Sequence, residues 1–319
     1  MRPGKLVLVG RHKVVGLTLV LLAQAAKTAP AWAAAPDGSA IEIWVRKPVA
    51  APTGGDASGR ERLEVLKLDG LPLIESKRVD IQYHGAFTYR GMEIRALIDR
   101  YRAPENVDLA LLHFANGMQI PLALRGDDLA MPAASAPFLA RAMQMRPGGP
   151  MRVGQFPKIS RPRSGFVDVR PITFTGNKVV VAGDGHPDVP TAAQGVLIPW
   201  QQVDSLIGIE LVSRAAYYAQ FDVDPTAKTG HKLFTQSCQF CHGVRKVGAA
   251  FGWDFVEPTP IYDYRGERNL FHHIKYKPLD ASARGLQMPA LSYMTEDDAR
   301  EIWLWLKAVG TKPLRPYAP

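Results

Sequence analysis

The sequence predicts two domains: an α+β domain rich in short strands, followed by a small all-α domain. Residues 36–224 contain short alternating strands separated by turn signals, whereas residues 226–310 contain two amphipathic helices. An acidic, proline-bearing stretch at 221–226 separates the two regions, so we place the boundary between residues 224 and 225. A chain of 319 residues is long for one domain and comfortable for two.

The first 35 residues have the order of a secretory signal peptide. Residues 1–13 carry four basic and no acidic side chains, an apolar run follows at 14–23, and small residues extend to Ala35. This run is shorter than the roughly 20 residues that a membrane-spanning helix needs. We therefore expect cleavage near Ala33 to Ala35, export to the periplasm and no stable membrane span afterwards. An uncleaved anchor is the alternative.

The α+β domain is predicted from short strands and turns. Alternating apolar and polar residues predict three strands, at 41–45, 79–83 and 166–169. A helix is predicted over 92–101. Asn116-Gly117 favours a tight hairpin between strands at 107–114 and 118–124, and a second hairpin is predicted around 175–178. These elements indicate a substantial core.

Residues 238–242, Cys-Gln-Phe-Cys-His, have the spacing of a c-type haem attachment site. Thiols three positions apart can each form a thioether to one vinyl group of the same porphyrin, and His242 can then bind the iron. Cys238 and Cys241 are the only cysteines of the chain, so both go into this one site. A thioredoxin-like CxxC is the alternative, but polar and Gly-rich sequence follows here instead of the helix that such a site needs.

Two predicted helices flank this motif. Residues 226–237 form an amphipathic helix that leads directly into Cys238. Thr295 is a favourable N-cap for a second helix, because three acidic residues follow it in the first turn. Gly310 and Pro313 end this helix. We expect the two helices to cross and to hold the haem between them.

Met288 is the predicted distal ligand of the iron. The following Pro289 stiffens the backbone, which a thioether needs in order to reach iron from a loop. A packing role for Met288 is the alternative, and Met294 is expected to pack. His272 and His273 compete as distal ligands, since either could give an iron with two histidine ligands.

Residues 226–310 resemble the class I monohaem cytochrome c domain. The helix with Gly230, the CxxCH motif, the Met-Pro pair and the acid-capped terminal helix occur in the family's order. The resemblance implies one covalently attached haem c, with thioethers to Cys238 and Cys241. It further implies His242 and Met288 as axial ligands of an iron that cycles between Fe(II) and Fe(III).

The α+β domain has a weaker likeness. Residues 87–94 and 115–122 resemble parts of the molybdopterin-binding fold of sulfite-oxidase-type enzymes, in which a D-G-Y turn is common. Residues 116–118 are Asn-Gly-Met instead. That family binds molybdenum through a cysteine, and both cysteines of this chain are committed to haem. We therefore expect residues 36–224 to be a degenerate member, without a Cys-ligated metal, that acts as a docking or scaffold module.

The charge composition limits which classes of binding partner we expect. Beyond residue 35 the chain has 34 Lys and Arg against 30 Asp and Glu, a mild net charge of +4. No basic run is interleaved with aromatics, so nucleic-acid binding is not expected. The partners are predicted to be redox proteins, a dehydrogenase and an acceptor.

The sequence therefore predicts a periplasmic c-type cytochrome that transfers single electrons, with no catalytic residues of its own. The first alternative is a haem-containing oxidoreductase subunit whose N-terminal domain binds a molybdopterin-type cofactor or a substrate. The second is a sensor or assembly module with open, five-coordinate iron, in which Met288 only packs.

Overall fold

A computed structural model describes much of residues 39–317, and Ala34–Pro319 form one compact unit. The described residues are 39–47, 59–80, 85–101, 106–124, 137–144, 147–153, 155–158, 172–180, 205–221, 225–276, 288, 291 and 293–317. The predicted signal peptide at 1–35 and the predicted strand at 166–169 lie outside these residues.

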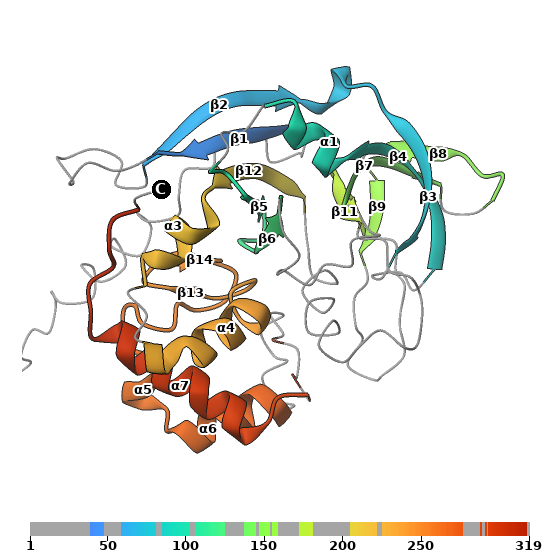
Figure 1. Cartoon of the computed structure of the whole chain (residues 1–319). Helices are drawn as coiled ribbons and strands as arrows, with labels where there is room; N and C mark the ends of the chain where they lie inside the picture. Colours follow the sequence, from blue (N-terminus) through green and yellow to red (C-terminus); the bar gives the residue numbers. More distant parts are fainter. Residues whose placement is uncertain are drawn as a thin grey trace, which may run out of the picture. The chain divides into compact units, whose positions relative to one another are not determined.

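A five-stranded sheet contains both ends of the described α+β region (Figure 1). In spatial order its strands are β2 (Arg60–Lys67), β1 (Ala40–Arg46), β12 (Leu206–Val212), β5 (Leu109–Phe114) and β6 (Gln119–Ala123). Strands β1 and β12 are parallel, and the other neighbours are antiparallel. Ile41 and Ile43 project into an apolar cluster because alternate residues of a strand share one face. The strand predicted at 41–45 is thus confirmed.

The hairpin predicted at Asn116-Gly117 is confirmed. Strand β5 pairs with β6, and Gly117 has a φ of 86°, a conformation that glycine adopts without strain. The Asn116 side chain accepts a hydrogen bond from the Met118 amide at 3.1 Å, which closes the turn locally.

A second sheet follows the order β11 (Lys178–Val180), β7 (Phe138–Gln144), β4 (Gly85–Glu93) and β3 (Ile74–Asp80), with β8 (Met151–Val153) on β7. Strands β9 (Gln155–Lys158) and β10 (Ile172–Thr175) form a separate pair. A short 3₁₀ turn, η1 (Leu68–Gly70), follows β2, and helix α1 (Ile94–Asp99) follows β4. Ile94, Leu97 and Ile98 of α1 are buried, as the predicted helix at 92–101 requires.

The hairpin predicted around 175–178 is wrong. Strand β10 before this turn pairs with β9, whereas β11 after it pairs with β7. At Gly176 the chain passes from the β9–β10 pair to the sheet that contains β7. The Asn177 side chain explains this turn, because it exchanges two hydrogen bonds of 2.9 Å with the backbone of Leu206, at the start of β12.

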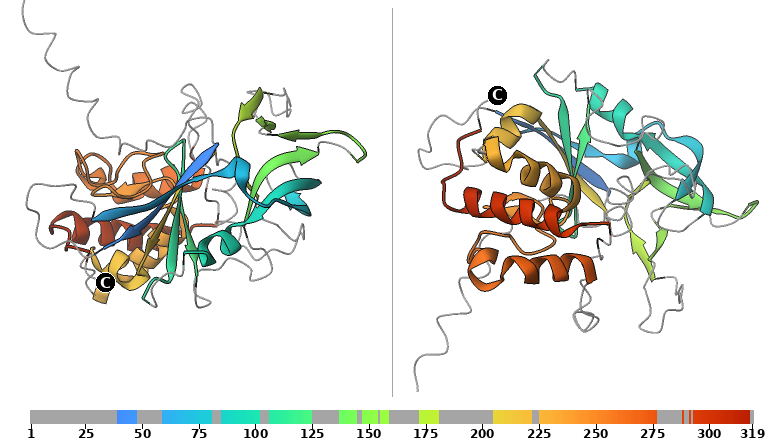
Figure 2. Two further views of the ribbon diagram at one scale, coloured as in Figure 1. Left: turned by 90° about the horizontal axis from the view of Figure 1, so that it is seen from above. Right: turned by 60° about the horizontal axis from the view of Figure 1, so that its bottom comes forward.

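Helices dominate the C-terminal segment. They are η2 (Pro225–Ala227), α4 (Lys228–Ser237), α5 (Ile261–Tyr264), α6 (Glu267–Tyr276) and α7 (Glu296–Gly310), and α7 lies along α4 (Figure 2). Thr295 and Asp298 form the capping box that starts α7. A Cβ on Gly230 would collide with the carbonyl of Glu301 and lie 2.7 Å from the Trp305 Cβ. Glycine at 230 therefore permits the close approach of the two helices.

The all-α prediction for this segment is confirmed only in part. A two-stranded hairpin, β13 (Gly243–Val244) with β14 (Val247–Gly248), directly follows the CxxCH motif. Its turn residues, Arg245 and Lys246, are not the Asn-Gly type that signals such a turn in a sequence.

Helix α3 (Arg214–Ala219) connects β12 to the C-terminal segment, and Ser213 is its N-cap. The predicted boundary after residue 224 stays a prediction. Among the described residues, no helix is long and apolar enough to cross a membrane.

Candidate functional site

The CxxCH motif begins where helix α4 ends. The amide of Cys238 still makes a helical hydrogen bond to Phe234, and the amides of Cys241 and His242 both donate to the Cys238 carbonyl, at 3.1 and 2.9 Å. These bonds curl the motif into a compact turn. Both cysteines are free thiols, and the turn holds them together with the imidazole in one short segment.

The two thiols border different apolar cores. Cys238 belongs to the cluster formed by α4, α6 and α7, together with Phe234 and Trp305. Phe240 is 4% exposed and belongs to the core of the α+β region, and Cys241 packs against that same core. The attachment motif thus lies between the two hydrophobic cores.

Backbone hydrogen bonds join the motif to the β5–β6 hairpin. The amide of Gln119 donates to the carbonyl of Phe240 at 3.1 Å, and the amide of Ala250 donates to the carbonyl of Gly117 at 2.8 Å. In addition, the Gln239 side chain and the Tyr218 hydroxyl are 3.0 Å apart at their closest polar atoms. The α+β region therefore fixes the peptide between the two cysteines.

Burial raises the pKa of the Cys238 thiol and of the Cys241 thiol to about 12. Both groups are therefore protonated at neutral pH. Among the described residues, no three His, Cys, Asp or Glu side chains gather as a metal site.

His242 presents one nitrogen for a ligand. Burial lowers its pKa, so the ring is neutral, and Nδ1 lies 2.7 Å from the carbonyl oxygen of Trp253. A carbonyl only accepts, so Nδ1 carries the proton and Nε2 keeps its lone pair. The ring stacks on Phe255 with centroids 4.4 Å apart. A Cβ on Gly252 would lie 2.5 Å from the His242 Cε1, so only glycine fits beside it.

The distal candidates differ in burial. Met288 is half-buried and packs against the cluster that contains Cys238. The amide of Leu291 donates to the Ile274 carbonyl at 2.9 Å, which anchors the chain just after Met288 to α6. His273 is half-buried, whereas His272 is exposed.

Met294 is 1% exposed and packs in the same cluster, as predicted. His231 packs between the rings of Tyr218 and Trp305, each with its centroid 5.3 Å away.

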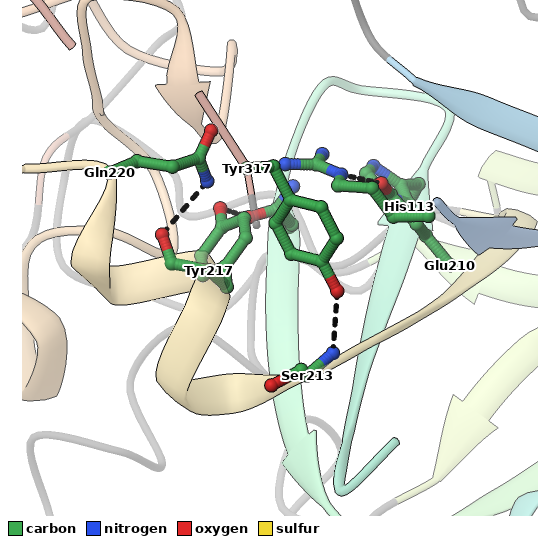
Figure 3. A network of polar contacts seen from close by, with 8 residues as sticks. His113, Glu210, Ser213, Tyr217, Gln220 and Tyr317 are labelled. Carbon is green, nitrogen blue, oxygen red and sulfur yellow. Dashed lines mark hydrogen bonds and ion pairs between the residues drawn. The ribbon is translucent and has the colours of Figure 1, made fainter. Parts of the chain in front are cut away.

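A buried polar network surrounds Glu210 of strand β12, in the first sheet (Figure 3). Glu210 pairs with Arg46 at 2.6 Å and with His113 at 3.1 Å. Burial alone would raise the pKa of Glu210, but the charge of Arg46 and the hydrogen bond from His113 lower it to about 2. Arg46 also lies against the rings of Tyr217 and Tyr317. His113 is therefore a satisfied core histidine.

The residues of the motif fit a covalently attached haem c. Neutral paired thiols supply the attachment points, and a neutral imidazole held at Nδ1 supplies an iron ligand at Nε2. When bound, such a group exchanges one electron at its iron. The sequence did not indicate that the backbone carbonyl of Trp253 accepts a hydrogen bond from His242, nor that Asp254 lies next to this acceptor. A backbone carbonyl is present at every residue, so no side-chain pattern in the sequence marks it.

Comparison with protein families agrees with this geometry. Residues 225–306 match the family described as cytochrome C oxidase, cbb3-type, subunit III. The match supports a cytochrome c domain in the C-terminal segment, a type of domain that binds haem c and transfers electrons. No curated protein matches the chain. The molybdopterin-fold likeness of residues 36–224 gains no support and stays a prediction.

Proposed function

We propose that this protein is a periplasmic electron-transfer cytochrome with one covalent haem c, ligated axially by His242 and Met288. The observation that carries the proposal is the state of His242: a neutral ring with Nδ1 bonded to the Trp253 carbonyl, directly after two free thiols. A ring in this state keeps a lone pair on Nε2 with which it can bind a metal.

Met288 supports the assignment of closed coordination. It is half-buried against the cluster that includes Cys238, on a segment anchored to α6. A thioether ligand raises the reduction potential, and six-coordinate iron leaves no position for a substrate. Both properties suit a carrier of single electrons.

The α+β region acts in this proposal as a scaffold for the attachment motif. Its hairpin binds the backbone of Phe240 and Ala250, and its core receives the Phe240 side chain. A rigid scaffold around the attachment motif limits how far the protein around the haem must rearrange when the iron gains or loses an electron. The signal-peptide pattern of residues 1–35 supports export, and the redox partners are a dehydrogenase and an acceptor.

The test is to purify the exported protein, denature it, and measure its mass and its redox titration. The proposal expects one haem retained per chain after denaturation, and a one-electron transition. A double variant, Cys238→Ser with Cys241→Ser, should retain no haem after the same treatment. Wild-type protein without covalent haem would overturn the proposal.

A further inference from the structure

The carboxylate of Asp254 accepts four backbone hydrogen bonds. Oδ1 accepts from the amides of Arg245, Val256 and Glu257, at 3.0, 2.8 and 2.9 Å. Oδ2 accepts from the amide of Lys246 at 2.6 Å. Two of these amides belong to the β13–β14 turn and two to the loop that follows Trp253, so one side chain joins two separate segments.

The β13–β14 turn is held in an unfavourable conformation. Arg245 has a φ of 51° and Lys246 a φ of 65°, and side chains other than glycine rarely adopt this left-handed region. The amides of these same two residues are the ones that Asp254 binds at the turn. Backbone strain of this kind persists only where the surroundings enforce it.

The segment that contains Asp254 also contacts His242, the predicted iron ligand. Trp253 directly precedes Asp254, and its carbonyl oxygen lies 2.7 Å from the His242 Nδ1. The carbonyl of Trp253 and the Cα of Asp254 share one planar peptide unit. An anchor at Asp254 therefore fixes the direction in which that carbonyl points.

We propose that Asp254 is a positioning residue for His242. By fixing the β13–β14 turn and the 253–257 loop to each other, its carboxylate orients the Trp253 carbonyl, and that carbonyl sets the ring orientation and donor strength of His242. The inference rests on the proposed function, because it takes His242 as the iron ligand. Partners of this kind tune ligand basicity in metal sites generally.

Three variants separate the effect of the carboxylate's position from the effect of its charge. Asp254→Glu keeps the charge but displaces the carboxylate by one methylene, so it cannot meet all four amides. Glu257→Gln removes a charge from the same loop, where the Glu257 side chain pairs with the Lys246 Nζ at 3.4 Å. Asp254→Asn removes both the charge and part of the acceptor capacity.

The readouts are the reduction potential and the solvent exchange of the His242 Nδ1 proton, followed by NMR on the haem-loaded protein. Asp254→Glu and Asp254→Asn should speed that exchange by about tenfold. Asp254→Asn should also raise the potential, because the variant lacks a negative charge near His242 and because a weaker hydrogen bond makes His242 a poorer donor. Glu257→Gln should leave the exchange unchanged, because the ion pair of Glu257 with Lys246 is solvent-exposed and contributes little to holding the turn. Adding Lys246→Gly to Asp254→Glu should slow the exchange again, since glycine holds the turn without strain.

Wild-type exchange in both Asp254 variants, with haem content normal, would overturn the inference and leave the proposed function intact. So would an exchange in Glu257→Gln as fast as in Asp254→Asn, because charge alone would then explain the effect. Wild-type protein lacking covalent haem would instead overturn the proposed function. Should Asp254→Asn not fold, the Asp254→Glu and Glu257→Gln pair decides the question.

Discussion

The amide of Gln119 donates a hydrogen bond of 3.1 Å to the carbonyl of Phe240, the residue just before Cys241. Gln119 begins strand β6, so this bond fixes the peptide between the two cysteines to the first sheet. The neighbouring bond from Ala250 to Gly117 adds a second attachment at 2.8 Å. The α+β region is thereby part of the structure that holds the haem motif.

Gly117→Ala should destabilise the protein more than Gly148→Ala. Both glycines have positive φ, 86° and 71°, so alanine is strained at either position by about 1 kcal/mol. A Cβ at 117 would also lie 3.0 Å from the carbonyl carbon of Ala250, whereas nothing lies within 4 Å at 148. Urea unfolding should give an additional loss of about 1 to 3 kcal/mol for Gly117→Ala. Equal losses would show that this contact does not matter.

Met288→Ala should open the sixth coordination position of the iron. The optical spectrum should change to that of a five-coordinate or water-ligated haem, and the reduction potential should fall because the thioether is lost. Met294→Leu is the matched control, since Met294 is 1% exposed in the same cluster and leucine conserves its volume. An unchanged spectrum in Met288→Ala would point to His273 as the distal ligand or to five-coordinate iron.

His231 should make the free energy of unfolding decrease as the pH is lowered. Burial lowers its pKa to about 4, and the unfolded value is about 6.5. Above pH 6.5 the group is neutral in both states, so its contribution is fully present there. As the pH falls from 6.5 to 4 only the unfolded chain takes up the proton, and the free energy of unfolding falls by about 3 kcal/mol.

His231→Phe is the comparison for this titration, because it fills the aromatic site without an ionisable group. Urea unfolding of both proteins at pH 7 and pH 4 measures the difference. The variant should lose less stability than the wild type over this range. Parallel losses would mean that His231 is protonated in the folded protein.

Tyr317 should hold the C-terminal tail to the α+β region. Its ring lies 5.4 Å from the Arg46 guanidinium, and its hydroxyl accepts a hydrogen bond from the Ser213 amide at 2.8 Å (Figure 3). Tyr317→Phe keeps the ring and should cost about 1 kcal/mol, whereas Tyr317→Ala should cost about 3 to 5 kcal/mol. Thermal unfolding measures both, and a tolerated Tyr317→Ala would contradict the packing role.

Local patterns predicted much of the fold. The alternation in β1, the Asn-Gly turn at Gly117 and the Thr295 cap all depend on neighbours in sequence, and each is found where it was expected. The turn at Gly176 was misjudged because its partners are strands distant in sequence. Sequence spacing does not determine which strands pair when the chain changes sheets.

The candidate attachment residues were accessible to sequence reasoning, but the contacts that support them were not. The CxxCH spacing identifies Cys238, Cys241 and His242 directly. The Trp253 carbonyl is a backbone group, and the four amides at Asp254 come from a turn whose residues, Arg245 and Lys246, predict no turn. Contacts of this kind depend on tertiary structure.

The most direct test of the central claim is the optical spectrum of the exported, haem-loaded protein, oxidised and reduced, with carbon monoxide added to the reduced form. The proposed coordination by His242 and Met288 predicts a low-spin spectrum that carbon monoxide does not change. A shift on adding carbon monoxide would contradict closed coordination, and would mean that the iron is open to ligands in the folded protein.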